Sequence, residues 1–524
     1  MIRKTIISVL CILLLFTACC REQMDITETA PDNIYPAPGA VNAYPEGEIM
    51  IVFDNEPVLT ENQYIYIYEK GISEPVDTIR IWTKKTGYTS NEQEDKGETQ
   101  TFGETILNVG FTRTWVRDKT LYIIPRHGIL QYNKTYSVVI PKEAIADAYF
   151  NEKEFTGFAG EEWSFKTRAA PFGLSAAKPI TVNASRCAAN NADFRTVWGA
   201  LNFVRTAPAG NYTIDVAPGV YNEIFHYIGP AQNNITINGT GNMKYGADVV
   251  LQGFNHAFLN PGSGNTHRRN AFYFSGPDNI TLKNITFKNL DEHTGSQAEV
   301  LHFANASAQF RAVYNCGFYG HQDTVLTSGR VWFYKCYIEG DTDYIWGSSS
   351  AALFEECEIV SINHNSGYIF VARLALGETV GKGYVALNSS LRSNRSGNFF
   401  GRTLPASTGS YCQAAVINST ISGSFMPSLW NVSHKSFLGN GEHVGFKVYN
   451  LKTPNGDSYN TSGRHNRTSL MSDELYYSEY NGRNAILNRI YVIETGMYKD
   501  APIQINLSSY EKKFNATPDE SRAK

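Results

Sequence analysis

Alternating apolar and polar residues mark short strands in the first third of the chain. Between Pro31 and Arg168, about seven β-rich runs are separated by turn-rich segments. The runs are Ile49 to Phe53, Tyr64 to Tyr68, Thr78 to Trp82, Thr105 to Val109, Leu121 to Ile124, Tyr136 to Ile140 and Trp163 to Lys166. Short alternating runs with turns between them predict an antiparallel β-sandwich.

A different pattern follows a linker of small residues, Thr167 to Lys178, where a domain boundary is expected. Short β runs recur beyond it, and most of them open with Asn. Examples are Asn234 to Ile237, Asn279 to Leu282, Asn284 to Phe287, Asn388 to Leu391 and Asn418 to Ile421. Asn suits a solenoid corner, because its amide can bond the stacked backbone. We therefore interpret the many Asn-x-Ser/Thr triplets as turn chemistry and not as glycosylation sites.

Three cysteines reveal the period of this solenoid. The segment from Asn315 to Gly320 recurs from Lys335 to Gly340 and again from Glu356 to Ile359, so that Cys316, Cys336 and Cys357 are spaced by 20 and then 21 residues. Such a period is typical of one coil of a β-solenoid. The fold class expected for this part is a right-handed parallel β-helix.

The same period predicts a pair of carboxylates on one face. Asp323 follows Cys316 by seven residues, and Asp343 follows Cys336 by seven. Equivalent residues of stacked coils lie about 4.8 Å apart, so the two side chains are expected side by side. Two acids at that distance titrate as a pair, with one proton donor beside one charged group. This is the arrangement of a general acid with a nucleophile or base.

Four motifs around these residues resemble the pectin methylesterase family. GHQDT resembles the family's GYQDTL, GDTDYIWG resembles GTVDFIFG, QAEVL from Gln297 to Leu301 resembles QAVAL, and the segment ending at Gly401-Arg402 resembles LGRPW. The wider resemblance runs from about Phe194 to about Tyr449. It implies the same parallel β-helix and a carboxylic ester hydrolase that removes methyl esters from the uronic acids of pectin.

The resemblance also implies a role for each matched residue. Asp343 corresponds to the family's nucleophile and Asp323 to its acid and base, while Gln297 and Gln322 would donate hydrogen bonds to the oxyanion. Arg402 would bond Asp343 and keep it ionised and oriented. His321, Tyr344, Trp346 and Trp430 are expected to contact the substrate, with packing in the core as the alternative for Trp430. No cofactor is implied.

The walls of the expected site depart from the family pattern. The Pro and Trp of RPW are Thr403 and Leu404, the aromatic residue before QDT is His321, and the two Phe of DFIFG are Tyr344 and Trp346. The chemistry is thus retained while the surroundings differ. The methyl ester is therefore expected either in homogalacturonan or in a branched pectic domain, with the branched domain as a testable hypothesis.

The N-terminus predicts export and a lipid anchor. Arg3 and Lys4 precede an apolar run that ends at Phe16, and Cys19 follows in a lipobox-like site, with Cys20 as an alternative. The run is too short for the roughly 20 residues that span a bilayer. We expect a signal peptide (1–18), a tether (19–31) and an outer-membrane lipoprotein on either the periplasmic or the surface face. The next units are a sandwich (32–168), a linker (169–178) and a β-helix (179–524).

The sandwich sequence resembles bacterial Ig-like domains, and a spacer role is favoured over glycan binding.

The composition argues against nucleic acid as a partner, because a formal net charge of −4 with 18% charged residues excludes a basic nucleic-acid-binding surface. A pectic polysaccharide and the membrane are the expected partners of a monomeric protein. Cys187, Cys316, Cys336, Cys357 and Cys412 are expected to be free thiols, and no motif predicts a metal site.

Three alternatives stay open from the sequence. The first is another pectin-active enzyme on the same fold, such as a lyase or a hydrolase that also uses paired carboxylates. The second is a serine esterase, for which the nearest motif is Gly347 to Ala351. The third is a surface lipoprotein that binds glycans without catalysis, since a fold alone does not decide function.

Overall fold

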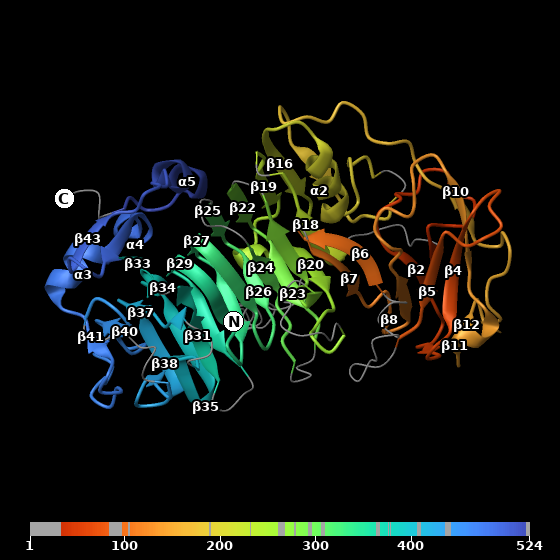
Figure 1. Cartoon of the computed structure of the whole chain (residues 1–524). Helices are drawn as coiled ribbons and strands as arrows, with labels where there is room; N and C mark the ends of the chain where they lie inside the picture. Colours follow the sequence, from red (N-terminus) through yellow and green to blue (C-terminus); the bar gives the residue numbers. More distant parts are fainter. Residues whose placement is uncertain are drawn as a thin grey trace, which may run out of the picture.

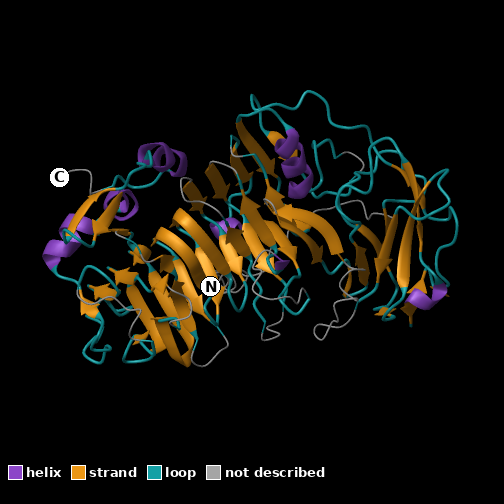
Figure 2. Cartoon of the chain, in the orientation of Figure 1, coloured by secondary structure: helices purple, strands orange, loops and turns teal. Residues whose placement is uncertain are grey.

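The computed structural model contains an antiparallel β-sandwich at one end, a long solenoid in the middle and a small helical segment at the other end (Figures 1 and 2). The structure describes residues 33–82, 97–102, 105–187, 190–230, 232–259, 268–276, 279–291, 296–304, 310–362, 367–375, 377, 379–405, 410–434 and 442–519. The predicted signal peptide, the tether and the lipid site at Cys19 lie outside these residues. No helix in the described ranges is both long and apolar enough to cross a membrane.

Two four-stranded antiparallel sheets form the sandwich. One contains β1 (Ile34–Tyr35), β2 (Ile49–Val52), β9 (Thr120–Ile123) and β8 (Thr114–Arg117) in that order. The other contains β14 (Ser164–Lys166), β10 (Thr135–Val139), β4 (Tyr64–Glu69) and β5 (Asp77–Arg80). Buried residues from both sheets, such as Ile51, Ile67 and Val138, share one apolar core. Most of the predicted runs therefore form strands of the sandwich, and the alternation of buried and exposed side chains is clearest in β4, β5 and β9. The Ig-like assignment stays a prediction.

Smaller elements complete the first part of the chain. They are the pairs β3 (Val58–Leu59) with β11 (Ile145–Ala146), β12 (Tyr149–Phe150) with β13 (Lys153–Glu154) and β6 (Gly97–Phe102) with β7 (Thr105–Gly110), and the short helix η1 (Lys142–Ala144). The predicted run from Thr105 thus belongs to a separate hairpin and not to the sandwich. Figure 1 shows this hairpin between the sandwich and the first coils.

The solenoid stacks parallel strands in three series, which confirms the predicted parallel β-helix. The first series is β15 (Ile180–Val182), β16 (Asn211–Val216), β19 (Asn234–Gly239), β22 (Asn279–Lys283), β25 (Phe310–Tyr314), the second halves of β27 (Val325–Tyr334) and β29 (Ile345–Glu355), β34 (Gly383–Leu387), β37 (Ala414–Ile417), β40 (Phe446–Tyr449) and β41 (Ser469–Leu470). The second is β17 (Gly219–Asn222), β20 (Val249–Gly253), β23 (Thr286–Asn289), β26 (Gly317–Tyr319), β28 (Tyr337–Gly340), β30 (Glu358–Ser361), the start of β35 (Ser390–Arg402) and β38 (Thr420–Phe425).

The third series carries the candidate site. It contains β18 (Phe225–Ile228), β21 (Phe272–Ser275), β24 (Leu301–Phe303), the first halves of β27 and β29, β31 (Tyr368–Ala372), the end of β35 and β39 (Trp430–Asn431). The remaining elements beside the coils are η2 (Lys244–Gly246), the pair β32 (Leu374–Ala375) with β36 (Ser410–Tyr411), and β33 (Thr379–Val380).

Like residues stack on like in the core of the solenoid. Ile237 pairs with Leu282, Leu282 with Val313, and Val313 with Phe333, all fully buried. Asn284, Asn315 and Asn418 adopt positive φ at the corners, and the Asn315 amide donates to Asn284 of the coil below. The Asn residues therefore act at corners as predicted. The described cysteines are free thiols, four of them buried and Cys187 exposed.

Helices cover the first coil and the outer face of the first strand series. Helix α2 (Val197–Thr206) is capped by Thr196 and buries Val197, Leu201 and Val204 against the first coil. The residues after β41 leave the coils and form α3 (Asp473–Glu479), α4 (Arg483–Asn488), the hairpin of β42 (Arg489–Val492) and β43 (Met497–Asp500), and α5 (Leu507–Phe514). The expectation of coils up to residue 524 was therefore wrong. These helices cover the outer apolar side chains of the first series, including Trp332 and Leu353.

Candidate active site

The register of the third series aligns three carboxyl-bearing residues. Leu301 of β24 pairs with Val325 of β27, and Val325 pairs with Ile345 of β29. Glu299, Asp323 and Asp343 each lie two residues before one of these paired strand residues. The alignment continues through these corners, because Val300 N–H donates to the Thr324 carbonyl at 2.9 Å and Asp323 N–H donates to the Thr342 carbonyl at 3.0 Å. Asp323 and Asp343 thus hold equivalent places on adjacent coils, as their spacing predicts, and Glu299 holds the corresponding place one coil earlier.

A sharp corner presents the two aspartates. Asp323 has a φ of 65° and Asp343 a φ of 52°, so both backbones are in the left-handed region. Asp tolerates this conformation better than most residues, but it still costs free energy that the surrounding structure must offset. The corner separates the second series of strands from the third and turns both carboxylates to the same side of the solenoid.

Arg402 binds Asp343 with two parallel hydrogen bonds. Its Nε donates to Oδ1 at 2.8 Å, and its Nη2 donates to Oδ2 at 2.5 Å. The arginine stands at the end of β35, and its guanidinium lies 5.4 Å from the centre of the Tyr368 ring. A bidentate pair of this kind fixes the plane of the carboxylate as well as its position. The contact is the one that the family resemblance implies for these two residues.

Asp323 has a different set of neighbours. Nη2 of Arg269 donates to Oδ2 of Asp323 at 3.1 Å and also to Glu299 Oε1 at 2.7 Å, while Nε of Arg269 contacts both oxygens of Glu299 at 2.9 and 3.0 Å. Burial and the negative charge of Glu299 raise the pKa of Asp323 well above its ordinary value, against the opposing charge of Arg269. Asp343 raises this pKa further, and Arg402 opposes it. The result is a carboxyl group with raised proton affinity beside a second carboxyl group that is bound to arginine through two hydrogen bonds.

The sequence interpretation missed Arg269 and Glu299. Glu299 is fully buried inside the apolar segment AEVLHF, at the place where the family motif QAVAL has a valine. A charged residue at a buried position requires a partner, and this was a signal in the sequence. The identity of the partner was not readable, since Arg269 lies 30 residues upstream.

Gln297 and Gln322 lie next to each other on the same side. The Ala298 N–H donates to the Gln322 carbonyl at 3.3 Å, which stacks the two segments. Both side chains are half-buried, and neither amide is hydrogen-bonded to another residue of the described ranges. They are thus available to donate hydrogen bonds to a bound group, as the sequence predicts for an oxyanion.

His321 and Trp346 border the aspartates. Nδ1 of His321 lies 3.2 Å from Oδ2 of Asp341, and this hydrogen bond raises the pKa of His321. The Trp346 ring is flanked by two guanidinium groups, Arg269 at 5.6 Å and Arg373 at 5.7 Å from its centre. Trp346 is 8% exposed and lies against Arg269, the arginine that contacts Asp323, whereas His321 is half-buried and precedes Asp323 by two residues, so their contact with substrate stays a prediction.

Two of the expected substrate contacts lie in the core instead. Tyr344 is fully buried, and its hydroxyl lies 3.0 Å from Ser361 Oγ. Trp430 is 1% exposed and stacks on Phe446 at 4.4 Å. The expectation of a substrate contact was wrong for both, because each side chain points inward and its surface is used by core neighbours. Thr403 and Leu404, which replace the family's Pro and Trp, are buried as well.

The serine motif does not form a nucleophile elbow. Residues 347–351 lie inside the extended strand β29, and Ser349 is fully buried and donates to Thr327 Oγ1 at 2.7 Å. An exposed serine on a strand-to-helix turn is required for that chemistry. Among the described residues, no cluster of three or more His, Cys, Asp or Glu side chains could hold a metal ion.

Comparison with known proteins gives one family. The family model described as pectinesterase matches residues 183–437. Pectinesterase A of Emericella nidulans is 36% identical over 161 residues, which cover 30% of this chain and 45% of that protein. A putative pectinesterase/pectinesterase inhibitor of Arabidopsis thaliana is 27% identical over 264 residues, which cover 48% of this chain and 52% of that protein. The chain thus spans about half the length of the curated relatives it matches.

Two solved structures are similar as well. A pectin methylesterase from carrot is 18% identical, with a TM-score of 0.48, and the match covers 60% of this chain and 95% of that one. A pectin methylesterase from Erwinia chrysanthemi is 19% identical, with a TM-score of 0.46 and coverage of 60% and 98%.

Proposed function

Residues 183–437 belong to the pectinesterase family, and we propose that this chain is a carboxylic ester hydrolase that removes methyl groups from esterified uronic acids of pectin. One observation carries the proposal. Asp343, which Arg402 holds through two hydrogen bonds, stands one coil from Asp323, whose pKa is raised by burial and by the charge of Glu299, and the amides of Gln297 and Gln322 lie beside them without a hydrogen-bond partner in the described residues. These are the parts that nucleophilic ester cleavage requires.

In the first half of the proposed reaction, an oxygen of Asp343 attacks the carbonyl carbon of the ester. The electron pair of the carbonyl bond moves to the oxygen, and the amides of Gln297 and Gln322 donate hydrogen bonds to the resulting anion. When the carbonyl bond forms again, the bond to the methoxy oxygen breaks. That oxygen takes the proton of Asp323 and leaves as methanol, so that an acyl group remains on Asp343.

In the second half, Asp323 acts as a base. Now charged, it accepts a proton from water, and the hydroxide attacks the acyl carbon. The bond to Asp343 breaks, the free uronic acid leaves, and Asp343 is again a carboxylate. The proton on Asp323 is the one that the next turnover needs, so the cycle closes without any other reactant.

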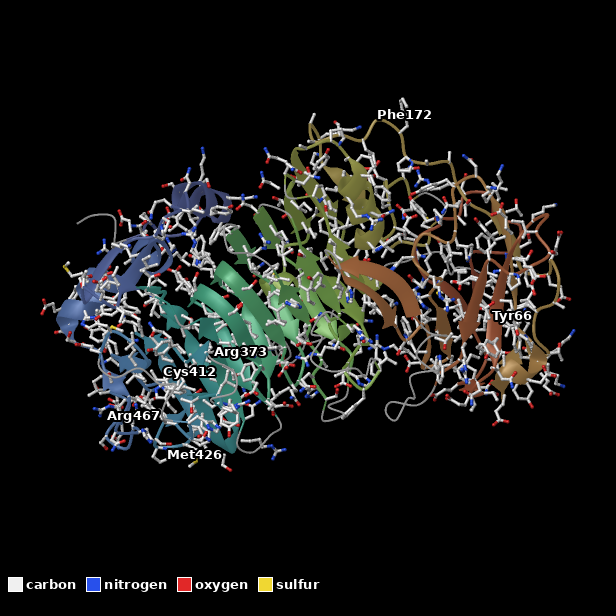
Figure 3. The ribbon with its side chains drawn as sticks, in the orientation of Figure 1. Tyr66, Phe172, Arg373, Cys412, Met426 and Arg467 are labelled. Atoms are coloured by element: carbon white, nitrogen blue, oxygen red, sulfur yellow. The ribbon has the colours of Figure 1, made fainter. Side chains whose placement is uncertain are left out.

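Arg373 supports an acidic substrate. Its half-buried guanidinium lies beside Trp346, and no carboxylate of the described ranges forms an ion pair with it. Arg269 and Arg402, in contrast, are both paired with carboxylates. Burial raises the pKa of the Cys412 thiol to about 11, and the positive charges of Arg402 and Arg373 oppose that rise, so both arginines lie near Cys412. Figure 3 shows Arg373 and Cys412 near each other. An unpaired cation here suits the free carboxylate of a uronic acid next to the ester.

The anchor and the sandwich enter the proposal only as context. We expect a lipid on Cys19 to hold the enzyme at the outer membrane, with the sandwich as a spacer. Both expectations rest on the sequence alone.

Methanol release tests the proposal directly. The full chain is incubated with methylated homogalacturonan and with native branched pectic fragments, and methanol and chain length are both measured. Methanol without chain shortening supports an esterase. Chain shortening without methanol identifies a lyase or a hydrolase, and binding with neither product identifies a glycan-binding protein.

A further inference from the structure

Glu299 and Arg269 form a buried ion pair directly beside Asp323. Glu299 is fully buried, and the side chain of Arg269 is 14% exposed. Arg269 directs three contacts to Glu299 and only one, at 3.1 Å, to Asp323. The guanidinium is thus chiefly the partner of Glu299. Asp323 is held at its edge by a single N–H.

In the cluster formed by Arg269, Arg402, Glu299, Asp323 and Asp343, two positive charges face three carboxyl groups, so the charges balance only when one carboxyl carries a proton. Burial raises the pKa of Glu299, but Arg269 opposes that rise with three contacts to Glu299 against one to Asp323, which favours the proton on Asp323. Ionised Asp323 adds a third negative charge in a place that is almost closed to water, where charges interact strongly. Without Glu299, the same two arginines would instead balance Asp323 and Asp343 in their ionised forms. Glu299 is therefore the group that shifts the balance toward protonated Asp323.

The position of Glu299 explains how it acts without touching the substrate. It occupies the corner equivalent to Asp323 one coil earlier, and the backbone bonds Ala298 to Gln322 and Val300 to Thr324 hold the two corners in register. The charged groups that face Asp323 are Glu299, Arg269, Asp343 and Arg402. Of these, Glu299 stands where the family motif QAVAL has a valine.

We propose that Arg269 and Glu299 are positioning residues for the acid–base step: Arg269 orients Asp323, and the buried charge of Glu299 keeps Asp323 protonated until methoxide leaves. The inference rests on the proposed function. Its consequence is an enzyme that stays active at higher pH, because the acid loses its proton later as pH rises.

The pH profile of kcat/KM for Glu299→Gln tests this role. Removal of the negative charge lowers the pKa of Asp323, so the basic limb should move to lower pH by about one unit. The matched control is Glu355→Gln, which changes another buried glutamate bonded to an arginine, Arg483, at 2.7 Å. Its basic limb should coincide with that of the wild type. A lower rate for Glu299→Gln at every pH, with an unmoved basic limb, would overturn the proposal in favour of a structural role.

Two further variants guard against misfolding. The double variant Arg269→Gln/Glu299→Gln leaves no unpaired buried charge. It should lower kcat and should shift the basic limb less than Glu299→Gln alone does. Arg269→Lys keeps the charge but loses the fork geometry, and it should lower kcat while KM is unchanged. Wild-type kcat in both variants contradicts the positioning role.

A measurement without activity separates this inference from the proposed function. A raised pKa means that Asp323 stabilises the fold at low pH and loses that contribution as pH rises through its folded pKa. The difference in Tm between Asp323 and Asp323→Asn chains, followed against pH, reports this titration. In the Glu299→Gln background the loss should occur at lower pH. If the contribution of Asp323 is lost at the same pH in both backgrounds, the role of the Arg269–Glu299 pair is refuted, even where no methanol is released. If the loss shifts as expected but the wild type is inactive, only the proposed function is refuted.

Discussion

Arg402 and Asp343 meet through two hydrogen bonds, at 2.8 and 2.5 Å, although 59 residues separate them in the chain. The carboxylate is thereby oriented before any substrate arrives, which reduces the entropy lost on reaching the transition state. Asp323, in the same place on the adjacent coil, has only one contact to an arginine. Two chemically identical residues in equivalent corners thus have different charged partners.

The first prediction concerns the nucleophile. Asp343→Asn should abolish methanol release and leave the fold intact, because the amide is nearly isosteric but cannot attack as an anion. Circular dichroism and methanol assays check both parts. Asp215→Asn, a similar change on a distant coil where the carboxylate accepts from Asn238 at 2.9 Å, should stay active. Turnover of Asp343→Asn at the wild-type rate would remove Asp343 from the mechanism.

The second prediction concerns the acid. Asp323→Asn should lower the rate on methyl esters by about 10²- to 10⁴-fold, the usual contribution of a general acid or base. An aryl ester of galacturonic acid, whose leaving group needs no proton, should recover part of the loss in the first, burst-phase turnover. Equal losses on both esters in that burst would argue against proton donation by Asp323.

The third prediction concerns the two amides. Gln297→Ala or Gln322→Ala should lower kcat by about two to three powers of ten, as found for single oxyanion donors. Gln131→Ala, on the exposed surface of the sandwich, serves as the control. An unchanged kcat with a higher KM would assign the residue to substrate binding in the ground state.

The fourth prediction concerns the unpaired arginine. Arg373→Ala should raise KM for oligomers that carry a free carboxylate next to the ester and leave kcat nearly unchanged. The loss should shrink as salt concentration rises, because salt screens the interaction. Arg395→Ala, an exposed position elsewhere on the solenoid, is the control. An equal effect on fully esterified and partly esterified oligomers would show that Arg373 does not read the carboxylate.

The fifth prediction concerns the pectic region that is cleaved. Leu404 stands where the family has a tryptophan, and a missing aromatic platform removes stacking worth about 1 kcal/mol. We expect higher kcat/KM on native branched fragments than on linear methylated homogalacturonan. A clear advantage for the linear polymer would contradict this preference.

The sequence by itself determined the coil and the aspartate pair. The spacing of Cys316, Cys336 and Cys357 sets the register of consecutive coils, and Val325 pairs with Ile345 as that spacing requires. A strand that slips by one residue turns all its side chains to the other face. The pattern therefore leaves one solution, in which Asp323 and Asp343 are neighbours. The sandwich strands were readable for the same reason, since alternation is a local property.

Only the tertiary structure decided which residues surround that pair. Arg269, Glu299 and Asp323 come from segments separated by 30 and 24 residues, and these lengths include loops that no period describes. The burial of Tyr344 and Trp430 and the covering of Trp332 by the C-terminal helices likewise depend on contacts between distant segments. A repeat determines which residues lie above and below each residue in neighbouring coils. Side-chain contacts across corners and at the ends depend instead on packing and charge, which are established only when the chain has folded.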